Sequence, residues 1–131
     1  MKKPKKLRVS FDFDNTLFGD EDYCSYMVNL LRNHILLGDE VLILTARNKD
    51  HEKPRWIKKN QPNRITIQQF LKFNNIPKIK IIYTNHGNKG LIAKKKKINI
   101  HYDNDWQEII SCRENGIIGI WIGKKHVHTT S

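Results

Sequence analysis

The stretch "SFDFDNTLFG", residues 10–19, ends an apolar run with two aspartates, Asp12 and Asp14, two positions apart. Alternate side chains of an extended strand share a face, so Asp12 and Asp14 are expected on one side and Phe11 and Phe13 on the other. Carboxylates held this close repel each other unless water, a cation or a shared proton relieves the repulsion, and each remedy also serves catalysis. The alternative is an ordinary strand that runs into a polar turn, where Asp is common.

The rest of the chain alternates expected strands with expected helices. Apolar runs rich in branched residues predict five strands, at residues 7–13, 40–45, 78–84, 98–103 and 117–123. Helical spacing and helix-breaking residues predict four helices, at residues 21–37, 64–75, 89–97 and 105–115. This alternation predicts an α/β fold of three layers, Rossmann-like, with a central parallel sheet of about five strands. The polar stretch 46–63 is long for a connection and is expected to be a functional loop.

The first expected helix has a start signal and a stop signal. Asp20 is expected to cap its N-terminus and Gly38 to end it. One stripe of its residues is expected to face the core: Tyr23, Tyr26, Met27, Leu30, Leu31 and His34.

Length and composition indicate one soluble domain. A chain of 131 residues builds one core, so residues 1–131 are expected to form a single domain with a basic tail (1–6) and a flexible C-terminal segment (124–131). No apolar run is long enough to span a membrane, and the start has no export signal, so we expect a cytoplasmic protein. Cys24 and Cys112 are too few for a disulfide framework and are expected to be free thiols.

The charge balance favours polyanionic partners. The chain has 24 Lys and Arg against 13 Asp and Glu, a formal net charge of +11, and residues 46–100 hold 15 of the cations and two acids. Such a field attracts nucleic acid or an anionic membrane. A basic surface that serves only solubility is the alternative.

Several side chains that could take part in catalysis or metal binding follow the expected strands. Ligands bind outside the carboxyl ends of the strands in open parallel sheets. The residues expected at this edge are Asp12 and Asp14 after the first strand, Thr45 at the end of the second, Lys89 after the third, and Asp103 and Asp105 at the fourth. Their order and common location favour one shared site.

These residues resemble the motifs of the haloacid dehalogenase (HAD) superfamily of phosphatases, over residues 7–122. "DFDNTL" resembles the first motif, "LILT" the second, Lys89 the third and "HYDND" the fourth, acidic motif. "LTAR" and "GNKG" are also similar to class B acid phosphatases and to the phosphatase domains of phage polynucleotide kinase-phosphatases. The fourth motif departs from the usual adjacent acids, which leaves open whether Asp105 contacts a metal ion.

The resemblance implies a role for each residue. Asp12 would attack the phosphoryl group to form an aspartyl-phosphate, and Asp14 would act as general acid and then general base. Thr45 would hydrogen-bond a transferring oxygen, while Lys89 would balance its charge. Mg²⁺ would be held by Asp12, Asp103 and the backbone carbonyl of Asp14.

Other candidates have plainer alternatives. The lysines at residues 94–97 rival Lys89 but are expected to be solvated on a short helix. Arg47 is expected either to clamp a substrate phosphate or to lie at the surface. Trp56 is expected either to stack on a terminal base or to pack. His101 is expected to pack beside the fourth strand, and His126 with His128 is a weak metal pair.

The sequence leaves little room for a substantial cap domain, either after Leu17 or between Thr45 and Lys89. An open site suits a large substrate, and with the positive charge this favours a phosphorylated nucleic-acid end, foremost a 3′-phosphate. A nucleotidase or broad acid phosphatase of small esters, and a nonenzymatic nucleic-acid-binding relative, are the alternatives. The choice between DNA and RNA, the 3′ or 5′ position and the oligomeric state stay open.

Overall fold

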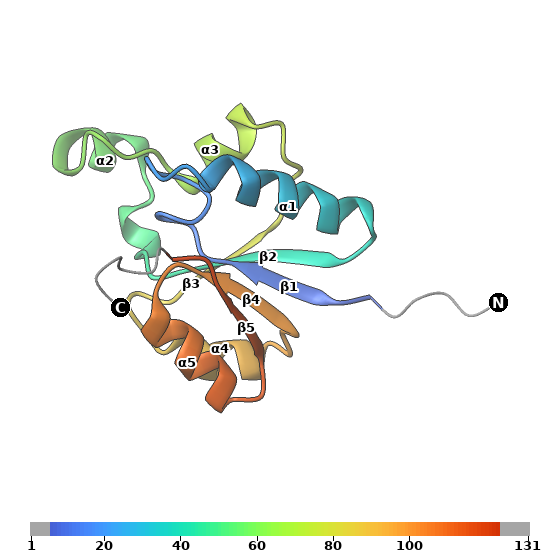
Figure 1. The fold of residues 1–131 in the computed structure, drawn as a ribbon. Helices are drawn as coiled ribbons and strands as arrows, with labels where there is room; N and C mark the ends of the chain where they lie inside the picture. Colours follow the sequence, from blue (N-terminus) through green and yellow to red (C-terminus); the bar gives the residue numbers. More distant parts are fainter. Residues whose placement is uncertain (1–5, 124–131) are drawn as a thin grey trace, which may run out of the picture.

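The computed structural model describes residues 6–123, which form an α/β fold around one parallel sheet (Figure 1). The strands, in sheet order, are β3 (Lys80–Tyr83), β2 (Glu40–Thr45), β1 (Arg8–Phe11), β4 (Ile100–Asp103) and β5 (Ile118–Trp121). Every neighbouring pair is parallel. The predicted fold class and all five predicted strands are confirmed, although the first strand ends at Phe11 and not at residue 13.

Helices cover both faces of the sheet. They are α1 (Cys24–Leu36), α2 (Pro54–Asn60), α3 (Ile67–Phe73), α4 (Lys89–Lys95) and α5 (Trp106–Glu114), with a short 3₁₀ helix, η1 (Lys49–His51). Helices α1 and α3 lie on one face, and α4 and α5 lie on the other (Figure 1). The three-layer arrangement is therefore as predicted.

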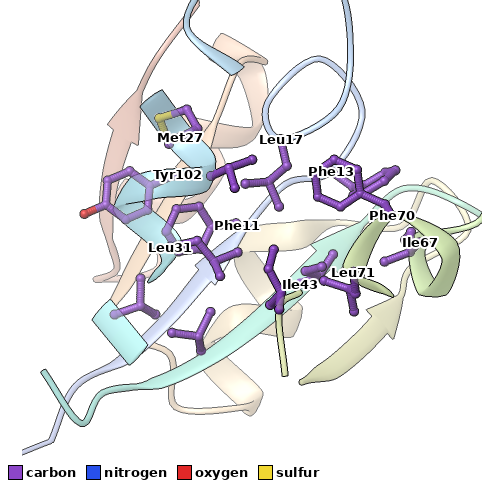
Figure 2. Close-up of a cluster of buried hydrophobic side chains, with 14 residues drawn as sticks. Phe11, Phe13, Leu17, Met27, Leu31, Ile43, Ile67, Phe70, Leu71 and Tyr102 are labelled. Carbon is purple, nitrogen blue, oxygen red and sulfur yellow. The ribbon is translucent and has the colours of Figure 1, made fainter. Parts of the chain in front are cut away.

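The larger core lies between the sheet and the layer formed by α1 and α3 (Figure 2). Phe11 and Phe13 are both fully buried there, as the alternation of residues 10–14 predicts. The expected stripe of α1 is only partly confirmed: Met27, Leu31 and His34 are buried, but Tyr26 is 66% exposed. A smaller cluster joins Leu44 to α4 and α5 on the opposite face.

The start of α1 differs from the prediction, whereas its end agrees. The helix begins at Cys24, and Tyr23 rather than Asp20 stands at the N-cap, without a capping side chain. The phenol of Tyr23 donates instead to the carbonyl of Asn15, which ties the helix start to the turn after β1. Gly38 follows the helix in the left-handed region (φ 89°), where a residue without a Cβ is favoured.

Residues 46–63 were expected to be a loop, and this expectation is wrong in part. The segment holds η1 and α2, and Pro54 occupies the first turn of α2, where its missing N–H costs nothing. Both elements are short, and the connection after β1, residues 12–23, contains no helix. Within residues 6–123 neither segment builds a substantial cap over the sheet edge, as predicted.

The strand order creates a switch point between β1 and β4. Connections from β1 run outward through β2 to β3, and the chain then crosses to β4 and β5 on the other side. In sheets of this kind the crevice beyond the carboxyl ends at such a point is the usual ligand site. Asp12 follows β1 and Asp103 ends β4, so the topology places both carboxylates at the crevice.

Among the described residues no helix is long and apolar enough to cross a membrane. The predicted flexible segment 124–131, the pair His126 and His128, and the first five residues of the basic tail lie outside the described part of the chain.

Candidate active site

Lys89 joins Asp12 to Asp103. Its Nζ lies 2.7 Å from Oδ1 of Asp12, which follows β1, and 2.8 Å from Oδ2 of Asp103, which ends β4. All three side chains are buried, with exposed fractions of 3% for Lys89, 8% for Asp12 and 0% for Asp103. The predicted convergence of these residues at one sheet edge is therefore what the structure shows.

The charges in this cluster shift one another's protonation. Burial raises the pKa of Asp12; the charge of Lys89 opposes this shift and that of Asp103 adds to it. Burial acts in the same direction on Asp103, but the hydrogen bond from His101 and the charge of Lys89 outweigh it and lower its pKa. Burial disfavours the charged form of Lys89, yet its two carboxylate partners raise its pKa. One ammonium thus serves two buried carboxylates, of which only Asp103 has a lowered pKa.

Asp12 and Asp103 each accept a hydrogen bond from a residue that follows shortly after them in the sequence. The hydroxyl of Thr16 donates to Oδ2 of Asp12 at 2.9 Å, from the turn that follows β1. The backbone N–H of Asp105 donates to Oδ1 of Asp103 at 2.9 Å. The side chain of Asp105 caps α5 through the N–H of Gln107, and the residue is exposed. Asp105 thus acts on the site through its backbone.

His101 takes part in the site, which the sequence did not indicate. Its Nε2 donates to Oδ2 of Asp103 at 2.8 Å, and its Nδ1 accepts from the hydroxyl of Ser10 at 2.7 Å. Burial lowers the pKa of His101, against the opposite effect of Asp103, and so favours the neutral ring. The packing role predicted for His101 is incomplete, because the ring also fixes the orientation of Asp103. The available signal was its alternation with Asp103, which places both side chains on one face of β4.

A close helix pair places Lys89. Lys89 is the first residue of α4, and Asn88 before it caps the helix and accepts from the hydroxyl of Ser111 in α5. A Cβ on Gly90 would lie 2.4 Å from the carbonyl oxygen of Ser111, so only glycine permits this approach. The rival lysines at residues 94–97 are all exposed, as predicted.

Asp14 belongs to a second ion cluster, centred on Arg47. The Nε and Nη2 atoms of Arg47 donate to the two oxygens of Asp14, each at 2.8 Å, and Nη1 donates to Glu52 at 2.8 Å and to the carbonyl of Ile65 at 2.7 Å. Burial disfavours the guanidinium charge, but the contacts with Asp14 and Glu52 raise the pKa of Arg47. Glu52 in turn accepts from the N–H of Ile67 at the start of α3.

The surface alternative for Arg47 is wrong, because its side chain is only 6% exposed. All three guanidinium nitrogens of Arg47 donate to the carboxylates of Asp14 or Glu52, so the arginine positions Asp14 in this structure. A contact between Arg47 and a substrate phosphate would require these ion pairs to rearrange, and it stays a prediction.

Thr45 and Trp56 lie in surroundings that the sequence did not foresee. Thr45 is buried at the end of β2, where its hydroxyl accepts from the backbone N–H of Arg47 at 3.2 Å. Trp56, in α2, stacks on His51 with ring centroids 4.0 Å apart and an angle of 5° between the rings. One face of Trp56 is therefore covered by His51. The contact of Thr45 with a phosphoryl oxygen and the stacking of a base on Trp56 stay predictions.

The donor set fits a magnesium ion in its chemistry. Asp12, Asp103 and the carbonyl of Asp14 supply oxygen only, the ligand type that Mg²⁺ prefers. The oxygens of Asp12 and Asp103 approach one another because both contact Lys89. Among the residues described here, no three His, Cys, Asp or Glu side chains form a metal cluster, so two carboxylates and a backbone carbonyl would have to suffice.

No protein-family model matches the chain, and no curated protein matches it either.

Proposed function

We propose that this protein is a magnesium-dependent phosphomonoester hydrolase of the HAD superfamily that acts on phosphorylated nucleic-acid ends. The observation that carries the proposal is the buried cluster of Asp12, Lys89 and Asp103 at the switch point of the sheet. A carboxylate that is to attack a phosphoryl group needs positive charge beside it, because the phosphoryl group is itself an anion, and the charge of Lys89 also opposes the rise that burial causes in the pKa of Asp12.

In the proposed reaction the carboxylate of Asp12 attacks phosphorus and the bond to the leaving oxygen breaks, which gives an aspartyl-phosphate and an alcohol. Asp14 gives a proton to the leaving oxygen and later takes one from the water that releases phosphate. Lys89 holds the attacking carboxylate in place and compensates charge, and Thr16 fixes its second oxygen. Magnesium, held by Asp12, Asp103 and the carbonyl of Asp14, would neutralise the phosphoryl oxygens.

The proposal assigns Arg47 the task of orienting Asp14. Its buried guanidinium donates to both oxygens of Asp14, and Glu52 links the guanidinium to the start of α3. Because the guanidinium bonds both oxygens of Asp14, one of the two contacts has to open before Asp14 can exchange a proton with a leaving oxygen, and the remaining contact then orients the carboxyl group.

Nucleic acid is the favoured substrate because of charge. The segment that follows Arg47 and Glu52 in the sequence and contains α2 carries several exposed cations. A positive field attracts a polyanion. A terminal 3′-phosphate is the first candidate.

The proposal is tested by comparing the hydrolysis of 3′-phosphorylated and 5′-phosphorylated DNA and RNA oligonucleotides, mononucleotides and a chromogenic phosphate ester, with Mg²⁺ and with a chelator. We expect phosphate release that needs Mg²⁺, that is abolished by Asp12→Asn, and that is unchanged in the control Asp50→Asn, which alters an exposed aspartate. Faster hydrolysis of mononucleotides than of oligonucleotides would favour the nucleotidase alternative. Oligonucleotide binding without any turnover would refute the hydrolase and leave a nonenzymatic binding protein.

A further inference from the structure

A cleft opens beside Asp14. It is lined on one side by the turn after β1, with Asp14, Phe18 and Asp20, and on the other by Asn63 and Arg64 from the connection between α2 and α3. Its volume is about 230 Å³. None of the roles described so far uses Asp20, Asn63 or Arg64.

The cleft lies where a leaving group would depart, if the proposed function holds. The group protonated by Asp14 has to lie on the side of that carboxylate, and the cleft is walled by Asp14 itself. The side chain of Asp14 is 29% exposed, whereas Asp12 is almost fully covered. The cleft is lined by Asp14 but not by Asp12, so a group bound in it lies next to the carboxylate that protonates it in the proposed reaction.

The size and the walls of the cleft suit one nucleoside. Pockets for drug-sized ligands commonly measure about 300–1,000 Å³, so this cleft holds a smaller unit. Phe18 offers a half-buried apolar surface that is fixed by Phe13, with ring centroids 5.7 Å apart, and by an edge contact with Phe70. Asn63 and Asp20 supply an amide and a carboxylate for the hydroxyl groups of a sugar or the edge of a base.

Arg64 marks the direction in which a longer strand would continue. It is an exposed residue of the cleft wall. Its backbone N–H donates to the carbonyl of Gln61, and its guanidinium donates to Oε1 of the same residue at 3.3 Å, which fixes the turn after α2. Residues 53–64 contain five Lys or Arg and no acid. This basic run leads from the cleft onto α2, and a guanidinium at its start matches the geometry of a phosphodiester.

We infer that the cleft between the turn after β1 and the connection from α2 to α3 binds the terminal nucleoside of an oligonucleotide, and that Arg64 pairs with the phosphodiester that follows it. The inference rests on the proposed function for the reaction at the terminal phosphate, and it predicts that oligonucleotides are preferred over mononucleotides.

The test is equilibrium binding of a labelled single-stranded hexanucleotide with a terminal 3′-phosphate to the full chain, measured by fluorescence anisotropy in chelator so that no turnover occurs. Competition by the matching mononucleotide gives its affinity in the same assay. The variants are Arg64→Gln and the control Lys95→Gln, which removes one exposed positive charge from α4 on the opposite face of the sheet. A third variant, Asn63→Trp, fills the cleft.

We expect Arg64→Gln to reduce the preference for the hexanucleotide over the mononucleotide about tenfold, as for a lost hydrogen bond to a charged group. The slope of log affinity against log salt should fall by about 0.7, the value for one phosphate contact on a single strand, while Lys95→Gln leaves the preference unchanged. Asn63→Trp should weaken both ligands. Equal effects of Arg64→Gln and Lys95→Gln, or unchanged binding in Asn63→Trp, would overturn the inference. Normal binding without turnover in Mg²⁺ would instead refute only the hydrolase.

Discussion

Replacing Lys89 by methionine tests the central cluster most directly, because the change keeps the length of the side chain and removes its charge. The ammonium contacts two buried carboxylates at 2.7 and 2.8 Å, and little water reaches any of the three groups. In Lys89→Met the positive charge beside Asp12 and Asp103 is lost, so Asp12, whose pKa burial already raises, either takes up a proton or remains a buried charge without an ionic partner. Removing one partner of a buried ion pair typically costs about 3–5 kcal/mol.

We expect Lys89→Met to lower the free energy of unfolding at pH 8 by about 3 kcal/mol or more, measured by urea denaturation in chelator. For a chain of this size each kcal/mol shifts the melting temperature by about 4 °C. The matched control is Lys95→Met on the same helix, where the side chain is exposed and the change should stay within about 0.5 kcal/mol.

Two further measurements separate charge from packing. Adding Asp12→Asn to Lys89→Met should recover about 1 kcal/mol or more, since neighbouring charges are coupled. Millimolar Mg²⁺ should also stabilise Lys89→Met, by about 2.7 kcal/mol when its concentration is a hundredfold above the dissociation constant. A loss below about 1 kcal/mol in Lys89→Met, or strictly additive effects of the two substitutions, would contradict the reasoning from buried charge.

Two other predictions concern groups outside the site. The hydrogen bond from His34 lowers the pKa of Asp39, and the N–H of Leu7 adds to this shift. The ionised Asp39 therefore stabilises the fold above pH 3.8, the ordinary pKa of an aspartate, and this stabilisation is lost as the pH falls through the lowered pKa. Asp39→Asn should therefore flatten the fall of the urea midpoint below about pH 4, and an unchanged acid limb would refute this. Burial raises the pKa of Cys112 to about 12 and also raises that of Cys24, so neither thiol should react with an alkylating reagent at pH 7.5 until the chain unfolds; rapid labelling of the native protein, measured by mass spectrometry, would contradict this.

The sequence predicts the site where the relevant signal is local or topological. Alternation placed Phe11 and Phe13 in the core, and the order of strands and helices brought Asp12, Lys89 and Asp103 to one edge. These inferences need only the period of a strand and the rule that parallel strands end together.

The partners of Arg47 and the hydrogen bonds of His101 could not be found in the same way. Arg47 contacts Asp14 and Glu52 because residues 46–66 return to the turn after β1. The course of this segment depends on η1 and α2, and its polar composition did not predict either element. His101 meets Ser10 through the register of β1 against β4, and a single sequence does not specify which strands pair.

Burying the charges of the two ion clusters costs desolvation free energy, and this cost helps to decide whether the clusters have a functional or a structural role. Arg47 and Glu52 are buried in one cluster, as Asp12, Lys89 and Asp103 are in the other. Well-packed apolar residues in place of a buried ion pair often leave a fold equally or more stable, so stability alone is a poor reason to retain such pairs. Both clusters lie where the chain leaves β1, beside the crevice that the strand order creates. Their location at a ligand crevice, and not in the middle of a helix layer, favours chemistry over support of the fold.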